Sequence, residues 1–470
     1  MRLYNTLTRS EENFVPGPGN TVRMYTCGLT VYARGHIGNF RTFICVDVLR
    51  RTLRHLLGYE VRQVMNFTDV DDRTIIGAQK AGMDLRTYTE QYIAMFRDDA
   101  RALGLEAVEE TPRATDEANL QAMADLIRAL EKNGHTYVSD GSIYFKISTL
   151  PAYGKLAHLD AEGMKPGARV DSDNYAKEDA RDFVLWKATK PDEPTWTVVD
   201  PPGRPGWHLE CSAMALRLLG ESPIDIHAGG IDLIFPHHEN EIAQSEGATG
   251  KLFSRFWMHV EYLIVEEKKM SKSLGNTYTI PDVIAKGYRP SAVRYLLLSA
   301  HYRKQLNFTW DSLAGAEKAL QRLTDCLGRL DAITREGSHD ELTARVAAAQ
   351  HAFADAMRDD LNTAAALGAM FELVSDLNSA IDAGAVGKGD VAVAKAAFDG
   401  FDRVLGVVSL RQAEDAKPPV PKEEIEQQIE SRNAARRRRD FGAADRIRDD
   451  LAARGVLLED SPSGTRWKRK

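Results

Sequence analysis

The feature that most constrains the fold is a strand, turn, helix and strand pattern near the start of the chain. VRMYTC (Val22–Cys27) has the apolar character of a buried strand, and apolar residues at helical spacing follow from about Gly38 to Leu57. VRQVMNF (Val61–Phe67) is a second apolar strand. Two such strands joined through a helix lie parallel in one sheet. The pattern therefore predicts a βαβ unit and an α/β fold.

The remaining chain divides by changes of pattern. At 470 residues it is too long for a single core, so several domains are expected. Helical patterns cover about 85–103 and 117–132, and short strands and turns follow, including a hairpin-like stretch at 137–145. Apolar strand and helix signals then return. We predict the following segments: 1–133 and 206–310 as two halves of an α/β domain, 134–205 as an insertion, 311–410 as a helix bundle, 411–421 as a linker, and 422–470 as a small basic domain, mostly helical until Gly455.

Composition is that of an ordinary soluble globular protein, with 43% hydrophobic and 27% charged residues. No run is long and apolar enough to span a membrane, and the first twenty residues do not have the pattern of a signal peptide. The four cysteines are too sparse for a disulfide framework. We expect a protein of the reducing cytoplasm whose thiols remain available as metal ligands.

The formal charge of −7 is unevenly distributed. Residues 422–470 carry 13 Lys and Arg against 10 Asp and Glu, and include the run Arg436–Arg439 and the terminal stretch RWKRK with Trp467. Basic clusters with an aromatic residue suit nucleic acid, because cations contact phosphates and a ring stacks on a base. The alternative from composition is a solvated charged helix.

A third feature is FPHHENE (Phe235–Glu241), which holds two histidines and two glutamates. In a helix, His237 and Glu241 lie one turn apart on the same face, which is half of a tetrahedral metal site. The stretch alone does not exclude a polar helix face that carries these residues by chance.

Two further stretches suit phosphate chemistry. GHIGNF (Gly35–Phe40) lies where the turn after the first strand enters a helix, and backbone N–H groups at a helix N-terminus favour anions. KKMSKSLGN (Lys268–Asn276) predicts a cationic loop that closes on a polyphosphate. Each alone is a weak signal, since such tetrapeptides and lysine turns are common.

Together these stretches resemble the marker motifs of class I aminoacyl-tRNA synthetases, a HIGH-like tetrapeptide early and KMSKS late. The further stretches MYTCGLTVY, NFTDVDD, RPGWHLECSAM and DIHAGGIDLIFPHHENEIAQS resemble the cysteinyl-tRNA synthetase family, and the resemblance runs nearly end to end. It implies a Rossmann-like parallel-sheet catalytic domain split by the insertion, then an α-helical bundle and a small C-terminal anticodon-binding domain. It also suggests a monomer.

The resemblance implies one zinc ion, held at the positions of Cys27, Cys211, His237 and Glu241. His238 is expected to point elsewhere on the helix and not to be a ligand. Cys45 and Cys326 fall within apolar helical patterns and are expected in the core.

The implied reaction has two steps, with L-cysteine, ATP and tRNA(Cys) as substrates. The cysteine carboxylate attacks the ATP α-phosphate to give cysteinyl-adenylate, and a terminal ribose hydroxyl of the tRNA then takes the cysteinyl group. Charge grows on phosphate oxygens, so cationic and hydrogen-bonding stabilisers are needed. The resemblance assigns catalysis to His36, Asn39, Lys269 and Lys272. Mg²⁺ would accompany ATP.

One position departs from the family motif, because Asn39 stands where the HIGH motif ends in histidine. An amide donates to a phosphate or to the adenosine, but it cannot carry a positive charge. The share of Asn39 in catalysis therefore stays open.

Other binding positions follow from the same resemblance. ATP would also contact Gly38, Gly229, Gly230 and Asp232, where the glycines allow close backbone approach. The amino-acid pocket would be formed by Cys27, Thr68, Trp207 and His227. Core packing is the alternative for Trp207.

We expect the zinc ion to select cysteine by accepting the substrate sulfur, because a thiolate is a softer ligand than serine's hydroxyl. The insertion is short for a hydrolytic editing module. This agrees with a site whose selectivity for cysteine makes editing unnecessary. A purely structural zinc is the alternative.

Two rival functions remain. A paralogue that joins cysteine to a glucosaminyl inositol in mycothiol synthesis would keep the zinc and ATP motifs, but it needs no basic tail. A catalytically inactive, synthetase-like RNA-binding protein would not need Lys269, Lys272 and all four ligands. We expect the tail to bind the anticodon region of tRNA through Arg436, Arg437, Arg438, Arg439 and Trp467.

Overall fold

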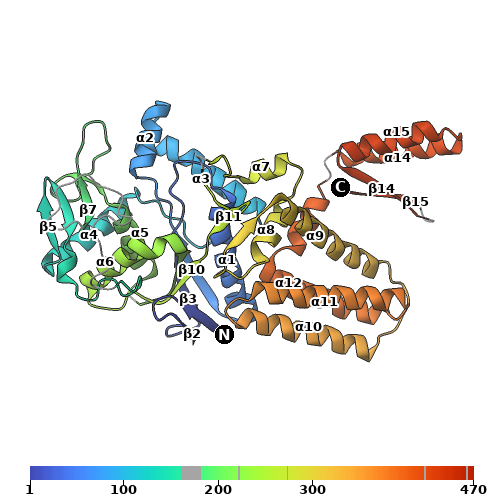
Figure 1. Ribbon diagram of the computed structural model, residues 1–470, viewed down its shortest axis with the longest axis horizontal. Coiled ribbons are helices and arrows are strands. Elements are labelled where there is room, and N and C mark those ends of the chain that lie inside the picture. The colour runs from blue at the N-terminus through green and yellow to red at the C-terminus, as the bar shows by residue number, and fades with distance from the viewer. Residues whose placement is uncertain (160–180, 221–222, 272–273, 418–419, 462–463, 470) are drawn as a thin grey trace.

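The computed structural model describes residues 1–159, 181–220, 223–271, 274–417, 420–461 and 464–469 (Figure 1). Its α-helices are α1 (Ile37–Arg51), α2 (Asp72–Ala81), α3 (Leu85–Ala102), α4 (Glu117–Lys132), α5 (Trp207–Leu219), α6 (Glu239–Thr249), α7 (Ile280–Ala285), α8 (Pro290–Leu298), α9 (Trp310–Asp331), α10 (Asp340–Arg358), α11 (Thr363–Asp382), α12 (Lys388–Leu405), α13 (Val408–Asp415), α14 (Lys422–Arg437) and α15 (Phe441–Ala453). None of the described helices is both long enough and apolar enough to cross a membrane.

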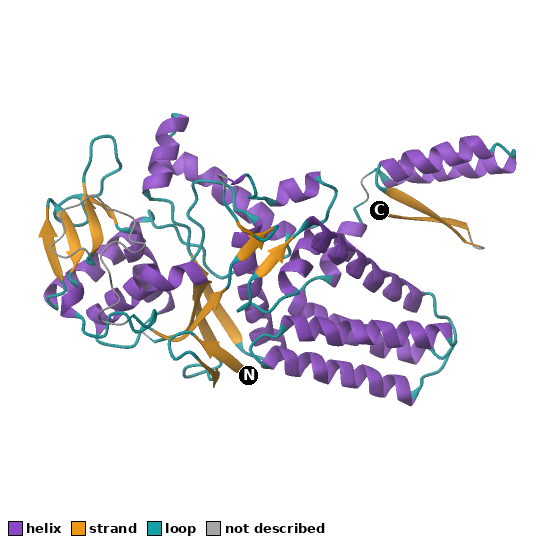
Figure 2. Cartoon of the chain, in the orientation of Figure 1, coloured by secondary structure: helices purple, strands orange, loops and turns teal. Residues whose placement is uncertain are grey.

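In the described ranges the strands, orange in Figure 2, form five separate sheets. They are β1 (Arg2–Asn5), β2 (Ser10–Asn13), β3 (Thr21–Thr26), β4 (Glu60–Met65), β5 (Thr136–Ser139), β6 (Ser142–Phe145), β7 (Phe183–Ala188), β8 (Gly203–Pro205), β9 (Ile224–Gly230), β10 (Ser254–Val260), β11 (Leu263–Val265), β12 (Lys268–Lys269), β13 (Leu306–Phe308), β14 (Val456–Ser461) and β15 (Gly464–Arg469).

The central sheet has the order β10-β9-β3-β4, and all of its strands are parallel. β3 and β4 are joined through α1 and pair directly, with Val22 opposite Val61. The βαβ unit and the α/β fold predicted from the sequence are therefore confirmed. The last helical turn before β4, Thr52–Leu56, is a π-helix and not a continuation of α1.

Two cores lie on opposite faces of this sheet because side chains alternate along each strand. Val22 and Met24 of β3 join the core that contains α1. Tyr25 and Cys27 join a second core, which includes Leu209 of α5. The alternation thus directs Cys27 to the α5 face.

The range predicted as an insertion holds an antiparallel sheet of order β5-β6-β7-β8. The predicted hairpin is present as β5 and β6, and its turn has left-handed backbone at Asp140 (φ 45°) and Gly141 (φ 73°). Such a turn matches the right-handed twist of the two strands. The helix α2 was not predicted. It begins with a capping box at Asp71 and ends at Gly82, which has a φ of 63°.

The helices α9 to α12 run side by side as a bundle (Figure 1). Arg294 of α8 is fully buried and ties this bundle to α1 of the α/β part of the chain. Its guanidinium donates to Asp47 of α1 (2.5 Å) and to the carbonyl oxygen of Leu405 at the end of α12 (2.7 Å). The buried arginine therefore has both a charge partner and hydrogen-bond acceptors.

The last domain consists of α14, α15 and the β14–β15 hairpin, and it lies apart from the bundle in Figure 1. Its helical part ends near Gly455 (φ 86°), as the sequence predicted. Among the described residues of this domain, the hydrophobic cluster is small and has five buried side chains: Val420, Ile425, Leu451, Val456 and Leu458. The helix α13 extends to Asp415, within the range predicted as linker.

Candidate active site and metal centre

Four buried side chains from distant segments meet on the α5 face of the central sheet. Cys27 follows the carboxyl end of β3, and Cys211 lies on α5. His237 lies in the short helix Ile234–His238 before α6, and Glu241 lies in the first turn of α6. Each is at most 6% exposed. The Sγ of Cys27 is 3.7 Å from the Sγ of Cys211, 3.6 Å from Nε2 of His237 and 3.4 Å from Oε1 of Glu241. His237 Nε2 is 3.1 Å from the same Glu241 oxygen.

These spacings suit a tetrahedral metal. Ligands at about 2.0–2.3 Å from one ion, at tetrahedral angles, lie roughly 3.3–3.8 Å from one another. Three of the four separations, 3.4–3.7 Å, fall within that range, and the 3.1 Å between His237 and Glu241 lies just below it. The four ligand atoms also lie within 4.8 Å of one another. The residues predicted as ligands are therefore brought together in a geometry that can hold a metal ion.

Close backbone packing positions Cys27. Its N–H donates to the carbonyl oxygen of Ala228 in β9 (3.2 Å). At the next residue, Gly28, a Cβ would lie only 1.6 Å from the carbonyl oxygen of Asn66. A side chain at that position is excluded, so glycine is required for the strand ends to converge.

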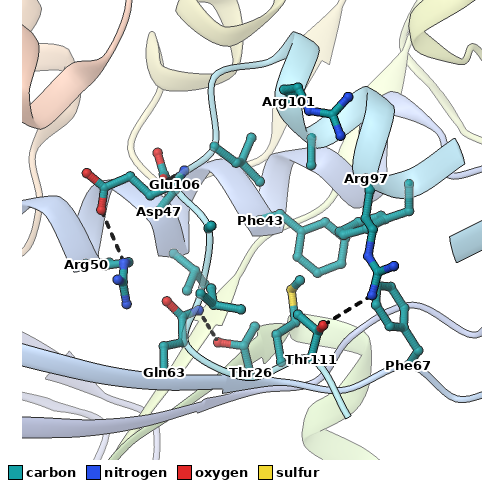
Figure 3. A pocket seen from close by; sticks show the side chains of 17 residues that line it. Thr26, Phe43, Asp47, Arg50, Gln63, Phe67, Arg97, Arg101, Glu106 and Thr111 are labelled. Carbon is teal, nitrogen blue, oxygen red and sulfur yellow. Dashed lines mark hydrogen bonds and ion pairs between the residues drawn. The ribbon is translucent and has the colours of Figure 1, made fainter. Parts of the chain in front are cut away.

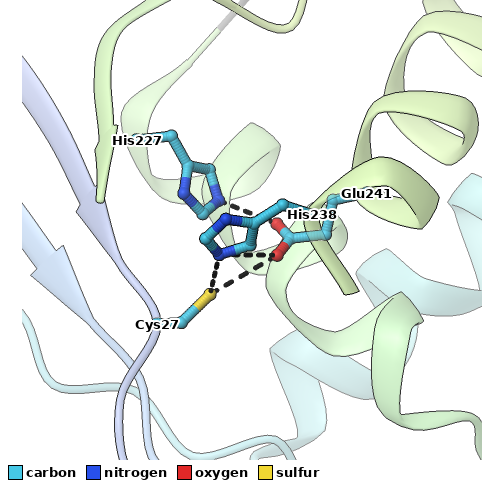
Figure 4. Close-up of side chains that lie close together, drawn as sticks. All are labelled: Cys27, His227, His238 and Glu241. Carbon is cyan, nitrogen blue, oxygen red and sulfur yellow. Dashed lines mark hydrogen bonds and ion pairs between the residues drawn. The ribbon is translucent and has the colours of Figure 1, made fainter. Parts of the chain in front are cut away.

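A second set of donors shares Cys27 and Glu241 and adds His227 and His238 (Figure 4). His238 Nε2 lies 3.3 Å from Cys27 Sγ, and His227 Nε2 lies 2.9 Å from Oε2 of Glu241. The prediction that His238 points elsewhere is therefore wrong. The backbone at Phe235 is non-helical, so the stretch is not one regular helix and His237 and His238 both face the cluster.

The charges within the cluster favour a cation. Burial opposes ionisation of Cys211, but hydrogen bonds from Cys27 and His237 lower its pKa to about 6. Burial likewise opposes ionisation of Glu241, but His227 and His237 lower its pKa to about 2. Burial would lower the pKa of His237, yet Glu241 and Cys211 raise it to about 10. A thiolate and a carboxylate thus attract positive charge to the place where a metal ion would supply it.

Two histidines at this cluster, His238 and His259, stay neutral. Burial, followed by the neighbouring His227, lowers the pKa of His259 to about 3 and that of His238 far below its ordinary value. His238 Nδ1 and His259 Nε2 are 2.8 Å apart, and His259 Nδ1 lies 2.8 Å from Thr6 Oγ1. Neutral imidazoles linked in this way hold the orientation of the ring next to Cys27.

The residues predicted for the amino-acid pocket surround the cluster. The ring of Trp207 stacks on His237 at 4.3 Å and remains 36% exposed, so core packing does not describe it. Thr68 is buried and donates to Oε2 of Glu210 (2.9 Å). His227 stacks on Trp257 at 4.4 Å. Trp207 therefore provides an aromatic wall that is accessible from solvent.

The N-terminus of α1 carries the HIGH-like motif. His36 is the N-cap, and its Nδ1 accepts from the N–H of Asn39 (3.2 Å). Oδ1 of Asn39 accepts from the N–H of His36 (3.0 Å). This capping box uses the oxygen of the Asn39 amide and leaves its NH₂ group as a donor.

Two other segments adjoin this helix end. The N–H of Ile37 donates to the carbonyl oxygen of Tyr278 (2.9 Å), and a Cβ at Gly38 would lie 3.5 Å from Sδ of Met270 in the KMSKS stretch. Lys269 is exposed at the end of β12, whereas Lys272 lies outside the described residues.

The carboxyl end of β9 lies between the cluster and α1, and it carries two closely packed glycines. A Cβ at Gly229 would lie 2.8 Å from the ring of His238, and one at Gly230 would lie 2.5 Å from Oδ1 of Asp232 and 3.8 Å from Thr42 of α1. Cys27, Cys211, His237 and Glu241 are called the metal-type cluster below. Glycines at 229 and 230 let this cluster and the N-terminus of α1 lie at the end of the same strand. This is the carboxyl edge of a parallel sheet, where α/β proteins bind ligands.

In the C-terminal domain, the predicted arginines Arg436 to Arg439 are all exposed. Arg436 pairs with Asp460 at 2.9 Å. Trp467 is half-buried, lies opposite Leu458 across the hairpin and packs against the small core. Arg432, which we did not single out, is buried and donates to both carboxylate oxygens of Asp460 (2.9 and 2.8 Å).

Sequence reasoning missed several residues that support the cluster: His259, Glu210, Asn66 and His208. His208 Nδ1 is 2.9 Å from Nδ1 of His237, and Asn66 Oδ1 accepts from the N–H of Gly28 (3.0 Å). His259 had a usable signal, because it is a polar residue within the apolar strand FWMHV. No sequence pattern singled out the other three residues, Glu210, Asn66 and His208.

Comparisons with known proteins place this geometry in a family. The family model described as "tRNA synthetases class I (C) catalytic domain" matches residues 13–318, "DALR domain" matches 352–410, and "Cysteinyl-tRNA ligase anticodon binding domain" matches 419–467. The chain is 52% identical to the cysteine–tRNA ligase of Solibacter usitatus, with all of both chains covered. It is 45% identical to that of Caldicellulosiruptor saccharolyticus, again over the whole of both chains.

Solved structures are similar in fold. A Mycobacterium tuberculosis methionyl-tRNA synthetase in complex with methionyl-adenylate matches with a TM-score of 0.60 at 18% identity, covering 84% of this chain and 91% of the other. A leucyl-tRNA synthetase from Agrobacterium radiobacter, in a ternary complex with tRNA, matches with a TM-score of 0.59 at 12% identity, covering 84% and 85%. The α/β catalytic domain, the matching family models and the full-length relatives agree, and this chain belongs to the cysteine–tRNA ligase family of class I tRNA synthetases.

Proposed function

We propose that this protein is a cysteine–tRNA ligase, which activates L-cysteine with ATP and transfers it to the 3′ end of tRNA(Cys). The observation that carries the proposal is the buried set of Cys27, Cys211, His237 and Glu241, beside the N-terminus of α1 at the carboxyl edge of the sheet. A thiol-selective site and a phosphate-binding helix end adjoin there, as joining cysteine to ATP requires. The full-length relatives support the same activity.

The metal is zinc in this proposal. Two thiolates, an imidazole and a carboxylate form a donor set that zinc prefers, and the spacings fit its tetrahedral geometry. We favour the set with Cys211 over the one with His227 and His238, because the latter offers only one thiolate. When bound, zinc would supply a soft Lewis acid that favours the thiolate of cysteine over the hydroxyl of serine. Mg²⁺ would accompany ATP.

The protein's own groups act on the phosphates during adenylation. The N–H groups at the start of α1 favour the anionic triphosphate, and His36 and the NH₂ of Asn39 donate to it. Gly38, Gly229 and Gly230 let the nucleotide approach the backbone, and Asp232 lies beside them. Lys269 and Lys272 offset the negative charge that develops on the phosphate oxygens as pyrophosphate leaves.

The substrate cysteine lies between the cluster and Trp207. The exposed ring of Trp207 covers the side chain from solvent, and Thr68 and His227 form the remaining wall. Excluding water there strengthens the charge interactions that orient the carboxylate toward the α-phosphate.

In the second step, the tRNA is held at both ends. The terminal ribose hydroxyl attacks the carbonyl carbon of the adenylate and AMP leaves. Arg436, Arg437, Arg438 and Arg439 contact phosphates of the anticodon region, and half-buried Trp467 packs beneath a base. We propose that the enzyme acts as a monomer in the cytoplasm, where tRNA is charged.

Two rivals differ in what they require. The mycothiol-pathway ligase joins cysteine to a small sugar amine and needs no anticodon module, whereas residues 419–467 match an anticodon-binding family. An inactive RNA-binding protein would not need the complete cluster. Charging purified total tRNA with radiolabelled cysteine tests the proposal directly. Cysteinyl-tRNA should form with ATP, and cysteine-dependent pyrophosphate exchange without tRNA charging would favour the mycothiol-type ligase.

The role of the metal in selectivity has its own test. Replacing zinc by cobalt makes thiolate coordination visible in the absorption spectrum. Cysteine should intensify the thiolate-to-cobalt charge-transfer band, and serine should leave it unchanged. If cysteine also leaves the band unchanged while adenylation continues, the metal is structural.

A further inference from the structure

Figure 3 shows the side chains that line a cavity of about 330 Å³. The cavity lies on the opposite face of the central sheet from the metal-type cluster. It is enclosed by β4, α1, α3 and the segment 105–111. The alternation of β4 fixes its side of the sheet: Met65 and Phe67 belong to the α1 core, whereas Val64 belongs to the core with Cys27. The cavity is therefore separate from the cysteine and ATP sites proposed above.

The inner wall is aromatic. Phe43, Phe67 and Phe96 line it and are each at most 6% exposed. Their rings pack edge to face at 5.1 Å (Phe43–Phe96) and 5.4 Å (Phe67–Phe96). A flat apolar ring is the ligand body that such walls bind best, and the volume falls within the range of small-molecule sites.

One polar group in this wall lacks a partner. Gln63 is 3% exposed, and its Nε2 donates to Oγ1 of Thr26 (3.1 Å). Its Oε1 is buried and accepts no hydrogen bond from any residue that the structure describes. Leaving a buried amide oxygen unpaired is costly, so this atom favours a ligand that carries an N–H or O–H donor.

Two arginines line the mouth of the cavity, and one of them, Arg101, pairs with Asp98 at 3.0 Å. Arg97 and Arg101 of α3 are exposed at its rim. Among the described residues, no carboxylate lies within ion-pair distance of Arg97, whose guanidinium lies over the ring of Phe67 at 5.8 Å. Its Nη2 is 3.5 Å from Oγ1 of Thr111.

The other charged lining residues already have partners. Arg50 donates to Glu109 (2.8 and 2.7 Å), and Asp47 accepts from Arg294 (2.5 Å). The charge that remains for a ligand at this cavity is therefore positive and lies on α3.

We propose that this cavity binds a small aromatic carboxylate that carries an N–H or O–H donor. The ring lies against the wall formed by Phe43, Phe67 and Phe96, the donor bonds to Oε1 of Gln63, and the carboxylate pairs with Arg97. The site does not depend on the ligase activity, since none of these residues belongs to the catalytic or metal site.

The test uses 5-fluoroindole-3-propionate as the probe, followed by ¹⁹F NMR on the full-length protein. Its ring, indole N–H and carboxylate match the three features of the cavity. Binding should saturate, and excess cysteine and ATP should not displace the probe. Because the readout is binding and not charging, failure of this proposal is distinguishable from failure of the proposed function.

Variants locate the probe. Arg97→Gln removes the cation and should weaken binding about tenfold or more. Ala100→Phe, at a lining position of α3, should block binding by filling the cavity. The matched control is Arg128→Gln, an exposed helical arginine on α4, which should bind as the wild type does. A probe that does not saturate, that ATP or cysteine displaces, or that binds both lining variants as well as the control overturns the proposal.

Discussion

The metal-type cluster and the C-terminal domain show two ways of using charge. In the cluster, ionisable groups are fully buried and fixed by one another, as with Cys27, Cys211 and Glu241. In the C-terminal domain, the run Arg436 to Arg439 is exposed at a helix end that packs on a small hydrophobic cluster. A buried set can discriminate a single atom of a small substrate, whereas exposed cations suit a large polyanion.

The two regions also differ in how much surrounding structure they need. The cluster depends on β3, α5 and α6 being packed together around the central sheet. The arginine run depends on one helix and on one ion-pair set to Asp460. We therefore expect the two regions to fail independently, with different activities lost.

The largest effect is expected at the cluster. Cys211→Ala removes a thiolate donor, and cysteine-dependent pyrophosphate exchange should fall by roughly a thousandfold, with loss of bound metal. Cys326→Ala is the matched control, because that thiol is equally buried but lies in the helix bundle. Metal content and exchange rate are measured together. A Cys211→Ala protein that keeps full exchange would remove the cluster from cysteine activation.

The second-largest effect is expected in the cationic loop predicted at Lys268–Asn276. Lys272→Ala should lower the single-turnover adenylation rate by about a hundredfold, because a contact to the developing charge is lost. Cysteine affinity should hardly change, since the amino-acid pocket is elsewhere. Lys268→Ala, on the exposed strand just before, serves as the control. Equal rates for wild type and Lys272→Ala would exclude Lys272 from the chemistry.

Removing the C-terminal domain sharpens the comparison between the regions. Deletion of residues 422–470 should reduce tRNA charging by roughly ten- to a hundredfold, because one of two tRNA-binding surfaces is lost. Pyrophosphate exchange, which needs no tRNA, should remain nearly intact. If both activities fall together, the domain supports the fold of the catalytic region, and its assignment to anticodon binding is wrong.

The smallest effect concerns the ion pair within that domain. The hydrogen bond from Arg432, aided by Thr465 and Arg436, lowers the pKa of Asp460 below its ordinary value. The stabilisation is therefore complete above the ordinary aspartate pKa of about 3.9 and is lost as the pH falls toward the lowered value in the folded state. Asp460→Asn should accelerate hydrogen exchange of the β14–β15 amides about fivefold at pH 6, a modest change because the carboxylate is partly exposed.

The same comparison has an internal check. Asp449→Asn changes an exposed carboxylate on α15 and should leave exchange unchanged. Wild type and Asp460→Asn should converge as the pH is lowered through the titration of Asp460. Persistence of the difference at low pH would show that the effect does not come from the ionised carboxylate.

Much of the fold followed from local patterns. Two apolar strands with a helix of period 3.6 between them predicted the parallel β3–α1–β4 unit, because strands joined through a helix lie parallel in one sheet. The hairpin of the insertion was predicted from the stretch 137–145, and the structure has its turn at Asp140 and Gly141. The π turn at Thr52–Leu56 and the helix α2 were not predicted, since neither has a periodicity that sets it apart from its surroundings.

The candidate site divides in the same way. The sequence by itself determined which donors are present, because Cys27, Cys211, His237 and Glu241 carry the chemistry wherever they lie, and the family motifs mark them. Only the tertiary structure decided which neighbours share the cluster. His238 turned toward Cys27 because the backbone is not regularly helical at Phe235, and His259 joined it from β10, far along the chain. Donor identity is a property of single residues, whereas distances between donors depend on how remote backbones pack, and no local pattern records that packing.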